Sequence, residues 1–354
     1  MGNVRFFVCV PVYNAAAYLG EAIESVLCQS YHHFSIILVD DGSTDGSLEI
    51  CKGYAARYTD IHVLSQTNQG QYAARMTAIR KAKDLSEYCD EAAFVLFLDA
   101  DDKYVPNAFE VLSDVIAGNA DVDTVVYGHT VTDVDGTELK LARRFYDGIV
   151  KDQSQLMTIV LSGRYQTYNA MWSKATRIDL FSDDDISFNR DVRVGEDLVQ
   201  SLSLLAKSHK TVFISDKLYQ YRDNPESIDH TTTPSKRFLD FIPRLDFIFS
   251  LLESGEYTQE CMAECCGLHV ILLLDFLFAV FREHDLTWMK KCECISHVND
   301  CKCLNDVLSL SRRPIRSWVI RLFCREHYLI GFLTAFVVKG WWVILRKLKQ
   351  FMPV

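Results

Sequence analysis

Two short clusters of acidic residues carry the clearest chemical signal in this sequence. Asp40 and Asp41 follow one apolar run, and Asp99, Asp101 and Asp102 follow another. Side chains alternate along an extended segment, so Asp99 and Asp101 project to the same side and can share one ligand. Hard divalent cations use one or two carboxylates when a diphosphate supplies further oxygens. The pattern predicts a Mg²⁺ or Mn²⁺ site, although acids after strands also form turns and helix caps.

The segments before these clusters predict an α/β fold. Short apolar runs alternate with stretches that have apolar residues at three- and four-residue spacing, as in a parallel sheet with crossover helices. In such sheets, ligands bind beyond the carboxyl ends of the strands, where both acidic clusters lie. The expected strands are 6–12, 35–39, 61–64 and 93–98, and the expected helices are 17–29, 47–58, 72–85 and 107–116.

The pattern changes after the first four strands. An antiparallel hairpin is expected from 124–134 and 138–144 around Asp135-Gly136, which makes the sheet mixed. A helix is expected from about Glu196, followed by strands at 211–214 and 218–222 and by helices from Ser235 onward. The predicted organisation is a catalytic domain at 1–232, a helical region at 233–310 and a basic apolar tail at 311–354.

Charge is spread unevenly over the 354 residues. The net charge of −10 argues against nucleic-acid binding, yet residues 312–354 contain nine Lys or Arg and one acid, Glu326. The apolar run 328–345 holds two Trp but is interrupted by Lys339, which makes it a poor membrane span and a better interfacial helix. We therefore expect peripheral membrane contact through 314–350, with a helix packed on protein as the alternative. The sequence does not determine the oligomeric state, and a homo-oligomer is one alternative.

Seven of the twelve cysteines lie between Cys261 and Cys303. The N-terminus does not resemble a signal peptide, so reduced cytoplasmic thiols are expected rather than disulfides. The string Cys292, Cys294, Cys301, Cys303 raises the alternative of a zinc site. Its one-residue spacing within each pair departs from the usual zinc pattern, which favours ordinary thiols.

Ordered motifs give the chain a resemblance to the family 2 glycosyltransferases, which have the GT-A nucleotide-sugar-binding fold. Over residues 4–230 the family's motifs are matched by 10–14 (VPVYN), 40–45 (DDGSTD), 68–70 (NQG) with 74–75 (AR), 99–102 (DADD), 171–174 (MWSK) and 195–197 (GED). Met76 stands where the family usually has Asn. The resemblance implies a GT-A mixed sheet with flanking helices, followed here by a helical C-terminal region.

The resemblance also implies roles for individual residues. Asp197 is the expected catalytic base, Asp101 the metal ligand with Asp99 beside it, and Asp41 the contact to the nucleotide base. The acceptor side is expected at Trp172, Lys174 and Glu196. Residues expected to bind the nucleotide-sugar donor are Pro11, Tyr13, Asp41, Asn68, Gly70, Arg75, Asp99, Ala100 and Arg222.

Residues 221–228 (YRDNPESI) resemble the family's segment after the base, with Asn224 where many members have His. Two assignments in and after this segment rest on residue chemistry. The guanidinium fork of Arg222 suits diphosphate oxygens, with a surface Arg at a strand edge as the alternative. His230 is a further candidate for the metal or a phosphate, against an ordinary solvated loop His. Asp197 itself has an alternative as an acid that favours the first turn of a helix.

The function implied is metal-dependent, inverting transfer of a sugar, with UDP as the expected carrier, to a hydroxyl of a glycan or lipid-linked acceptor. Such an enzyme of polysaccharide or cell-envelope synthesis is expected in the cytoplasm at the inner face of the membrane. The alternatives are a sugar-phosphate nucleotidyltransferase and a non-catalytic GT-A-like binding protein. A dinucleotide oxidoreductase is excluded because no G-x-G-x-x-G follows a strand.

Overall fold

The computed structural model describes residues 4–139, 145–161, 169–182, 196–225, 231–311 and 320–321. These residues group into two compact units along the chain. The first contains 4–139, 145–160, 169–182 and 196–225, and the second contains Leu161, 231–311 and 320–321. Each unit has its own cluster of buried apolar side chains.

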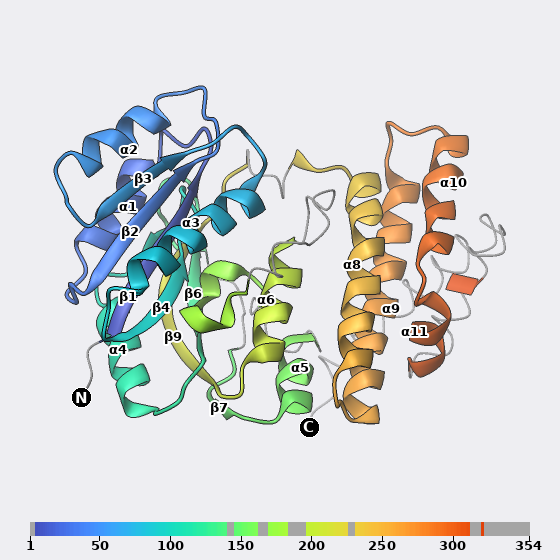
Figure 1. The fold of residues 1–354 in the computed structure, drawn as a ribbon. Coiled ribbons are helices and arrows are strands. Elements are labelled where there is room, and N and C mark those ends of the chain that lie inside the picture. The colour runs from blue at the N-terminus through green and yellow to red at the C-terminus, as the bar shows by residue number, and fades with distance from the viewer. Residues whose placement is uncertain are drawn as a thin grey trace. The chain divides into compact units, whose positions relative to one another are not determined.

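The first unit is built around one mixed sheet in the strand order β3-β2-β1-β4-β8-β6-β9-β5, with β7 paired to β9 (Figure 1). Neighbouring strands among β1 to β4 run parallel, whereas β8 is antiparallel to both of its neighbours. Its strands are β1 (Val4–Val12), β2 (Phe34–Asp40), β3 (Ile61–Ser65), β4 (Ala92–Phe97), β5 (Lys103–Tyr104), β6 (Thr124–Thr132), β7 (Gly148–Val150), β8 (Lys174–Arg177) and β9 (Thr211–Arg222).

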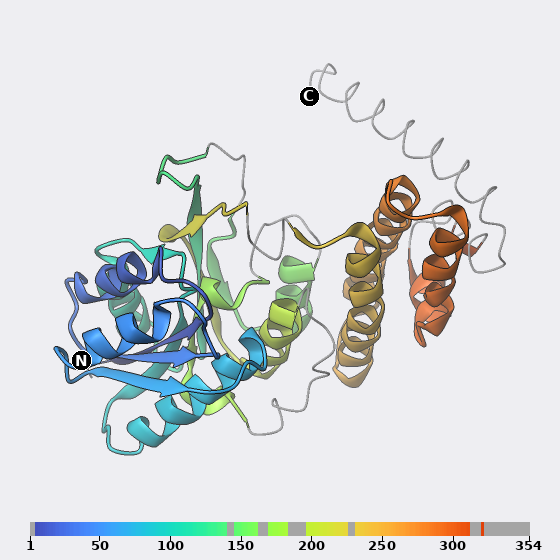
Figure 2. The same cartoon turned by 90° about the horizontal axis from the view of Figure 1, so that it is seen from above.

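Helices cover both faces of this sheet, as Figure 2 shows for α1 and α2 on one side and α3 on the other. The strand order moves outward from β1 to β3 and then returns across β1 to β4. Because the crossovers are right-handed, the helix of the returning connection, α3, lies on the face opposite to α1 and α2. The point of reversal between β1 and β4 is where such sheets bind ligands. The helices are α1 (Leu19–Leu27), α2 (Ser47–Ala55), α3 (Gln71–Ser86), α4 (Ala108–Gly118), α5 (Gln153–Leu161) and α6 (Glu196–Lys207), with short 3₁₀ turns η1 (Met171–Ser173) and η2 (Ile178–Leu180).

The predicted fold class is confirmed. The first four strands and four helices all form, with ends that differ from the expected ones by a few residues. The chain reverses at Asp133–Thr137 as expected, and Thr132 pairs antiparallel with Glu138, but 140–144 lie outside the described residues. The two strands expected at 211–214 and 218–222 form the single strand β9, whose register against β6 shifts around Gly128.

The second unit is helical. It consists of α8 (Pro234–Ser254), α9 (Gln259–Arg282), α10 (Trp288–Ser296), the 3₁₀ turn η4 (His297–Asp300) and α11 (Leu304–Leu310). The first three of these helices start in the same way: the hydroxyls of Thr233, Thr258 and Thr287 accept hydrogen bonds from backbone N–H groups in the first turn. Side chains of α8, α9, α10 and α11 then share one apolar core.

Candidate active site

The loops that follow β1 and β2 are tied to each other. Asn14 lies in the left-handed region, with φ of 48°, a conformation that Asn tolerates better than most residues. Its backbone N–H donates to Ser43 Oγ at 3.1 Å, and its Oδ1 accepts from the Thr44 N–H at 2.8 Å. Pro11 is buried behind this junction, while Tyr13 is 52% exposed beside it. The exposed ring is therefore accessible to a planar ligand such as a base.

Asp41 holds the loop that connects β3 to α3. Its side chain is buried and accepts hydrogen bonds from Gln66 Nε2 at 2.8 Å, the Gln69 N–H at 2.9 Å and the Gly70 N–H at 2.8 Å. These contacts make Asp41 the anchor of residues 66–70, where Asn68 and Gly70 are exposed. Its expected contact with the nucleotide base stays a prediction.

The acidic cluster after β4 forms a tight turn, in which the Asp102 N–H donates to the Asp99 carbonyl at 3.0 Å. Asp102 is buried and accepts from the Tyr219 hydroxyl at 2.8 Å and from the Arg222 N–H at 2.7 Å. Ala100 is also buried, whereas Asp101 is half-buried and accepts from Asn224 Nδ2 at 3.4 Å. Asp102 thus fastens the turn to β9 and leaves Asp99 and Asp101 at its open side.

Arg75 connects this turn to α6. Its side chain is fully buried, its Nη2 pairs with Asp99 Oδ1 at 3.0 Å, and its Nη1 pairs with Asp197 Oδ1. Gln71, one turn earlier on α3, donates to the same Asp99 oxygen at 3.0 Å. A buried guanidinium needs such charged partners, because an unpaired one would be strongly destabilising. Arg75 therefore brings together Asp99, which is expected on the donor side, and Asp197, which is expected to act on the acceptor.

The pKa values of Asp99 and Glu196 reflect their burial and the acids that lie close to them. The pKa of Asp99 is raised to about 6 by burial, although Arg75 lowers it, and the charges of Asp197 and Asp101 add to the rise. The pKa of Glu196 is raised to about 8, first by burial and then by the Asp197 charge. Asp101 and Asp197 therefore both lie near enough to Asp99 for their charges to raise its pKa.

Lys174 and Trp172, expected on the acceptor side, are both buried. Burial lowers the pKa of Lys174 to about 7, while the nearby Asp197 charge opposes that shift. Its amino group donates to the Ala170 carbonyl and to Ser173 Oγ. Trp172 stacks on Tyr219, with ring centroids 4.6 Å apart. Trp172 thus supports Tyr219, which in turn donates a hydrogen bond to Asp102, and an acceptor contact of Trp172 or Lys174 stays a prediction.

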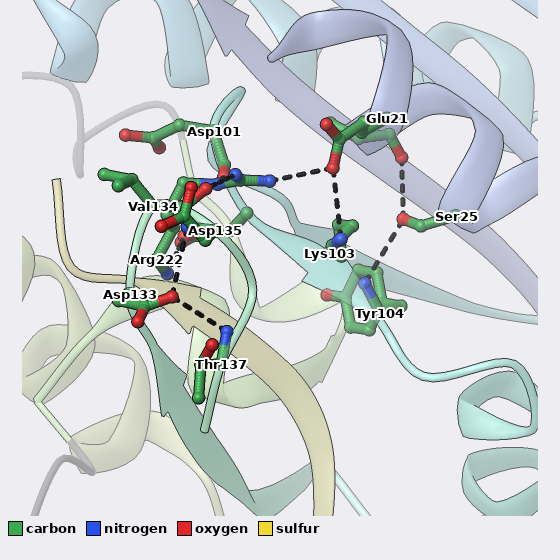
Figure 3. Close-up of polar contacts among 12 residues, drawn as sticks. Glu21, Ser25, Asp101, Lys103, Tyr104, Asp133, Val134, Asp135, Thr137 and Arg222 are labelled. Atoms are coloured by element: carbon green, nitrogen blue, oxygen red, sulfur yellow. Dashed lines mark hydrogen bonds and ion pairs between the residues drawn. The ribbon is translucent and has the colours of Figure 1, made fainter. Parts of the chain in front are cut away.

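The guanidinium of Arg222 is held by hydrogen bonds to other parts of the fold, as Figure 3 shows. Its guanidinium donates to Glu21 at 2.9 Å, to the Asp101 carbonyl at 2.9 Å and to the Val134 carbonyl at 2.8 Å. With 6% of its surface exposed, it is not the surface side chain of the alternative interpretation. A diphosphate contact would require exchange of some of these bonds. The recorded contacts instead make it a clamp that fixes the backbone of Asp101.

Several site residues were missed from the sequence. Gln66, Gln71, Glu21 and Tyr219 all contact the predicted acids or Arg222. Of these, Tyr219 had a usable signal, because alternation along β9 puts it on the same face as Tyr221. The others lie in helices or loops, where polar side chains carry no such pattern. His230, a candidate ligand, and Gly195 lie outside the described residues.

Comparisons with known proteins give the same family as the sequence motifs. Residues 7–177 match the family model "Glycosyl transferase family 2". The uncharacterized glycosyltransferase EpsJ of Bacillus subtilis is 31% identical over 66% of this chain, and the match spans 64% of EpsJ. The poly(ribitol-phosphate) beta-N-acetylglucosaminyltransferase TarS of Staphylococcus aureus is 27% identical over 63% of this chain, which is only 36% of TarS.

The fold has solved counterparts as well. A crystal structure of residues 1–349 of S. aureus TarS in complex with UDP aligns with a TM-score of 0.65 at 18% identity, covering 93% of this chain and 90% of that one. The similarity thus extends over the helical region as well as the sheet. The resemblance to the family 2 glycosyltransferases is therefore confirmed over residues 7–177.

Proposed function

We propose that this chain is an inverting glycosyltransferase that transfers a sugar from a nucleotide-sugar, with UDP as the expected carrier, to a hydroxyl of a glycan or lipid-linked acceptor. The observation that carries the proposal is the Asp99–Arg75–Asp197 bridge beside Asp101, which joins groups from α3, from the turn after β4 and from α6. The role of TarS as an N-acetylglucosaminyltransferase acting on poly(ribitol phosphate) supports a cell-envelope polysaccharide as the acceptor class.

The acidic turn after β4 fits a divalent cation. Asp101 is half-buried, and Asp99 carries a raised pKa because burial and two neighbouring acids outweigh the charge of Arg75. Asp101 would hold Mn²⁺ or Mg²⁺ with Asp99 beside it, since these ions prefer carboxylate and phosphate oxygens. When bound, the ion offsets the negative charge that grows on a departing diphosphate. Arg222 contributes by fixing the Asp101 backbone, and Asp102 by fixing the turn.

Asp197 is the proposed general base. Arg75 contacts Oδ1 of this carboxylate and so fixes its orientation, and we assign Oδ2 to the proton of the acceptor hydroxyl. A general base in this position typically contributes about 10²- to 10⁴-fold to the rate. The Asp197 side chain is 26% exposed, which leaves it open to an acceptor. Attack from this side, opposite the leaving diphosphate, would invert the anomeric carbon.

A panel of nucleotide-sugars tests this proposal, with Mn²⁺-dependent release of nucleoside diphosphate as the measurement. We expect release from one class of donor, and a large loss of that release in Asp101→Asn. The matched control is Asp84→Asn, which changes an exposed acid on α3 and should leave release unchanged. Metal-dependent release that persists in Asp101→Asn would show that the ion is held elsewhere.

A further inference from the structure

Two cysteines and an aspartate converge in the helical unit. Cys301 and Cys303 lie in the turn between η4 and α11, and Asp246 lies on α8, more than fifty residues earlier. The two sulfur atoms are 3.6 Å apart, and Cys301 Sγ is 3.3 Å from Asp246 Oδ1. One ligand atom from each of the three residues can be chosen so that all lie within 4.8 Å of one another.

The sulfur–sulfur separation and the separation between Cys301 Sγ and Asp246 Oδ1 are close to those around a tetrahedral zinc ion. Zinc–sulfur bonds of about 2.3 Å and zinc–oxygen bonds of about 2.1 Å imply sulfur–sulfur separations of about 3.8 Å and sulfur–oxygen separations of about 3.6 Å. The recorded 3.6 Å and 3.3 Å need only a few tenths of an ångström of relaxation. The backbone supports the arrangement, because the Cys303 N–H donates to Asp246 Oδ1 at 2.9 Å and thereby orients the carboxylate.

We propose that Cys301, Cys303 and Asp246 form a zinc site in the helical unit, with water in the fourth position. Both cysteines are buried and Asp246 is half-buried, so the carboxylate side gives access for the ion and the water. Each thiol loses its proton to solvent as its metal–sulfur bond forms, so binding releases two protons and transfers no electrons. Thiolate ligands favour zinc over the Mg²⁺ or Mn²⁺ proposed for the carboxylates of the first unit.

The site would fasten the end of the chain's helical region. The turn 301–303 carries α11, whose Leu304, Val307 and Leu308 pack into the shared apolar core. A metal link from this turn to α8 would hold α11 in place from its first residue. Zinc binding would then stabilise the folded unit, because the unfolded chain does not offer the three ligands together.

A second thiol pair in the same unit provides a matched control. Cys261 and Cys265 lie one turn apart on α9, with their sulfur atoms 4.0 Å from each other. Among the described residues, the group of potential metal ligands within mutual reach is Asp246 with Cys301 and Cys303, and it does not include this α9 pair. A comparison of variants in the two pairs therefore distinguishes metal binding from the general behaviour of buried, neighbouring thiols.

The test measures zinc in the full-length protein after growth with Zn²⁺ and gel filtration. We expect one zinc ion per chain in the wild type and in Cys265→Ser, and a strong loss in Cys303→Ser. Asp246→Asn keeps an acceptor for the Cys303 N–H but removes the negative charge. Because loss of a ligand costs at least as much as loss of a group that supports a ligand, this variant should weaken zinc binding by about tenfold or more. Replacement of the ion by Co²⁺ should give a thiolate-to-metal absorption band in the wild type and in Cys265→Ser.

Two results would overturn the proposal. One is wild-type protein that takes up neither Zn²⁺ nor Co²⁺ while its melting temperature shows that it is folded. The other is intact-protein mass two units below that of the reduced chain, with the loss mapped to Cys301 and Cys303, which would identify a disulfide. Neither result would bear on donor release at the sheet, so failure of this proposal is distinguishable from failure of the proposed function.

Discussion

At the scale of single residues, Arg75 has the most unexpected position. It was expected to bind the donor, yet its guanidinium lies fully buried between Asp99, 24 residues later, and Asp197, 122 residues later. Its pairing provides a physical reason for an arginine there, because two separated carboxylates need a planar donor with nitrogens on two sides. We therefore interpret Arg75 as the residue that positions the base, with any donor contact as a secondary role.

Glu196 yields a prediction about stability and pH in the absence of metal and donor. Its pKa rises from 4.5 to about 8 in the folded protein, mainly through burial. A carboxyl whose folded pKa is raised binds more protons than in the unfolded chain, so its stabilising contribution is complete below pH 4.5 and disappears as pH rises through about 8. We expect the melting temperature of the wild type to fall between pH 5 and pH 8 more steeply than that of Glu196→Gln. Parallel curves for the two proteins would contradict the assigned environment of Glu196.

At the scale of elements, the site depends on loops that are fixed by their own side chains. Asn14 joins the β1 loop to the β2 loop, and Asp41 joins the β2 loop to residues 66–70. Gly42 allows the close approach between them: its φ is +73°, and a Cβ there would lie 2.9 Å from the Asn68 nitrogen. Glycine is required on both counts.

Gly42→Ala should therefore be clearly destabilising, by about 1–3 kcal/mol, because it adds a steric clash with backbone to an unfavourable φ. The matched variant is Gly136→Ala, where φ is +85° but nothing lies within 4 Å of the added Cβ. Chemical denaturation of both variants would separate the two effects. Equal losses of stability in the two variants would mean that the contact with Asn68 is relieved without cost.

Much of the first unit was predictable because its signals are local. The runs before Asp40 and Asp99 form buried parallel strands, and the acids lie at their carboxyl ends as expected. The pairing of β8 between β4 and β6 was not predictable, since it depends on contacts between distant segments. For the same reason, the contact of Arg222 with Glu21, 201 residues earlier, could not be predicted. The convergence of Asp246 with Cys301 and Cys303 is a further long-range contact of this kind.

At the scale of the whole molecule, two segments bear on membrane contact: helix α9 and the basic tail at 314–350. Helix α9 is long and apolar enough to cross a bilayer, but more than half of its most apolar stretch is buried inside the structure. Its apolar residues, including Leu273 and Leu277, belong to the shared helical core, which accounts for its composition. The basic tail at 314–350 lies outside the described residues apart from 320–321.

We propose that this tail holds the enzyme at the inner face of the membrane, where lipid-linked acceptors would be presented. The nine basic residues after Ser311 and the two neighbouring Trp suit an anionic surface. Truncation after Leu310 should move the protein from the membrane fraction to the soluble fraction, and high salt should partly do the same for the full chain. A truncated protein that still pellets with membranes would place the contact in another segment.

We propose that Asp197 removes the acceptor proton at a site where other residues organise donor binding. The most direct measurement compares Asp197→Asn with wild type in two ways: the rate of sugar transfer, and donor binding by calorimetry with Mn²⁺. We predict a loss of transfer of about 10²- to 10⁴-fold with donor affinity nearly unchanged. Transfer near the wild-type rate, with donor binding intact, would contradict the account.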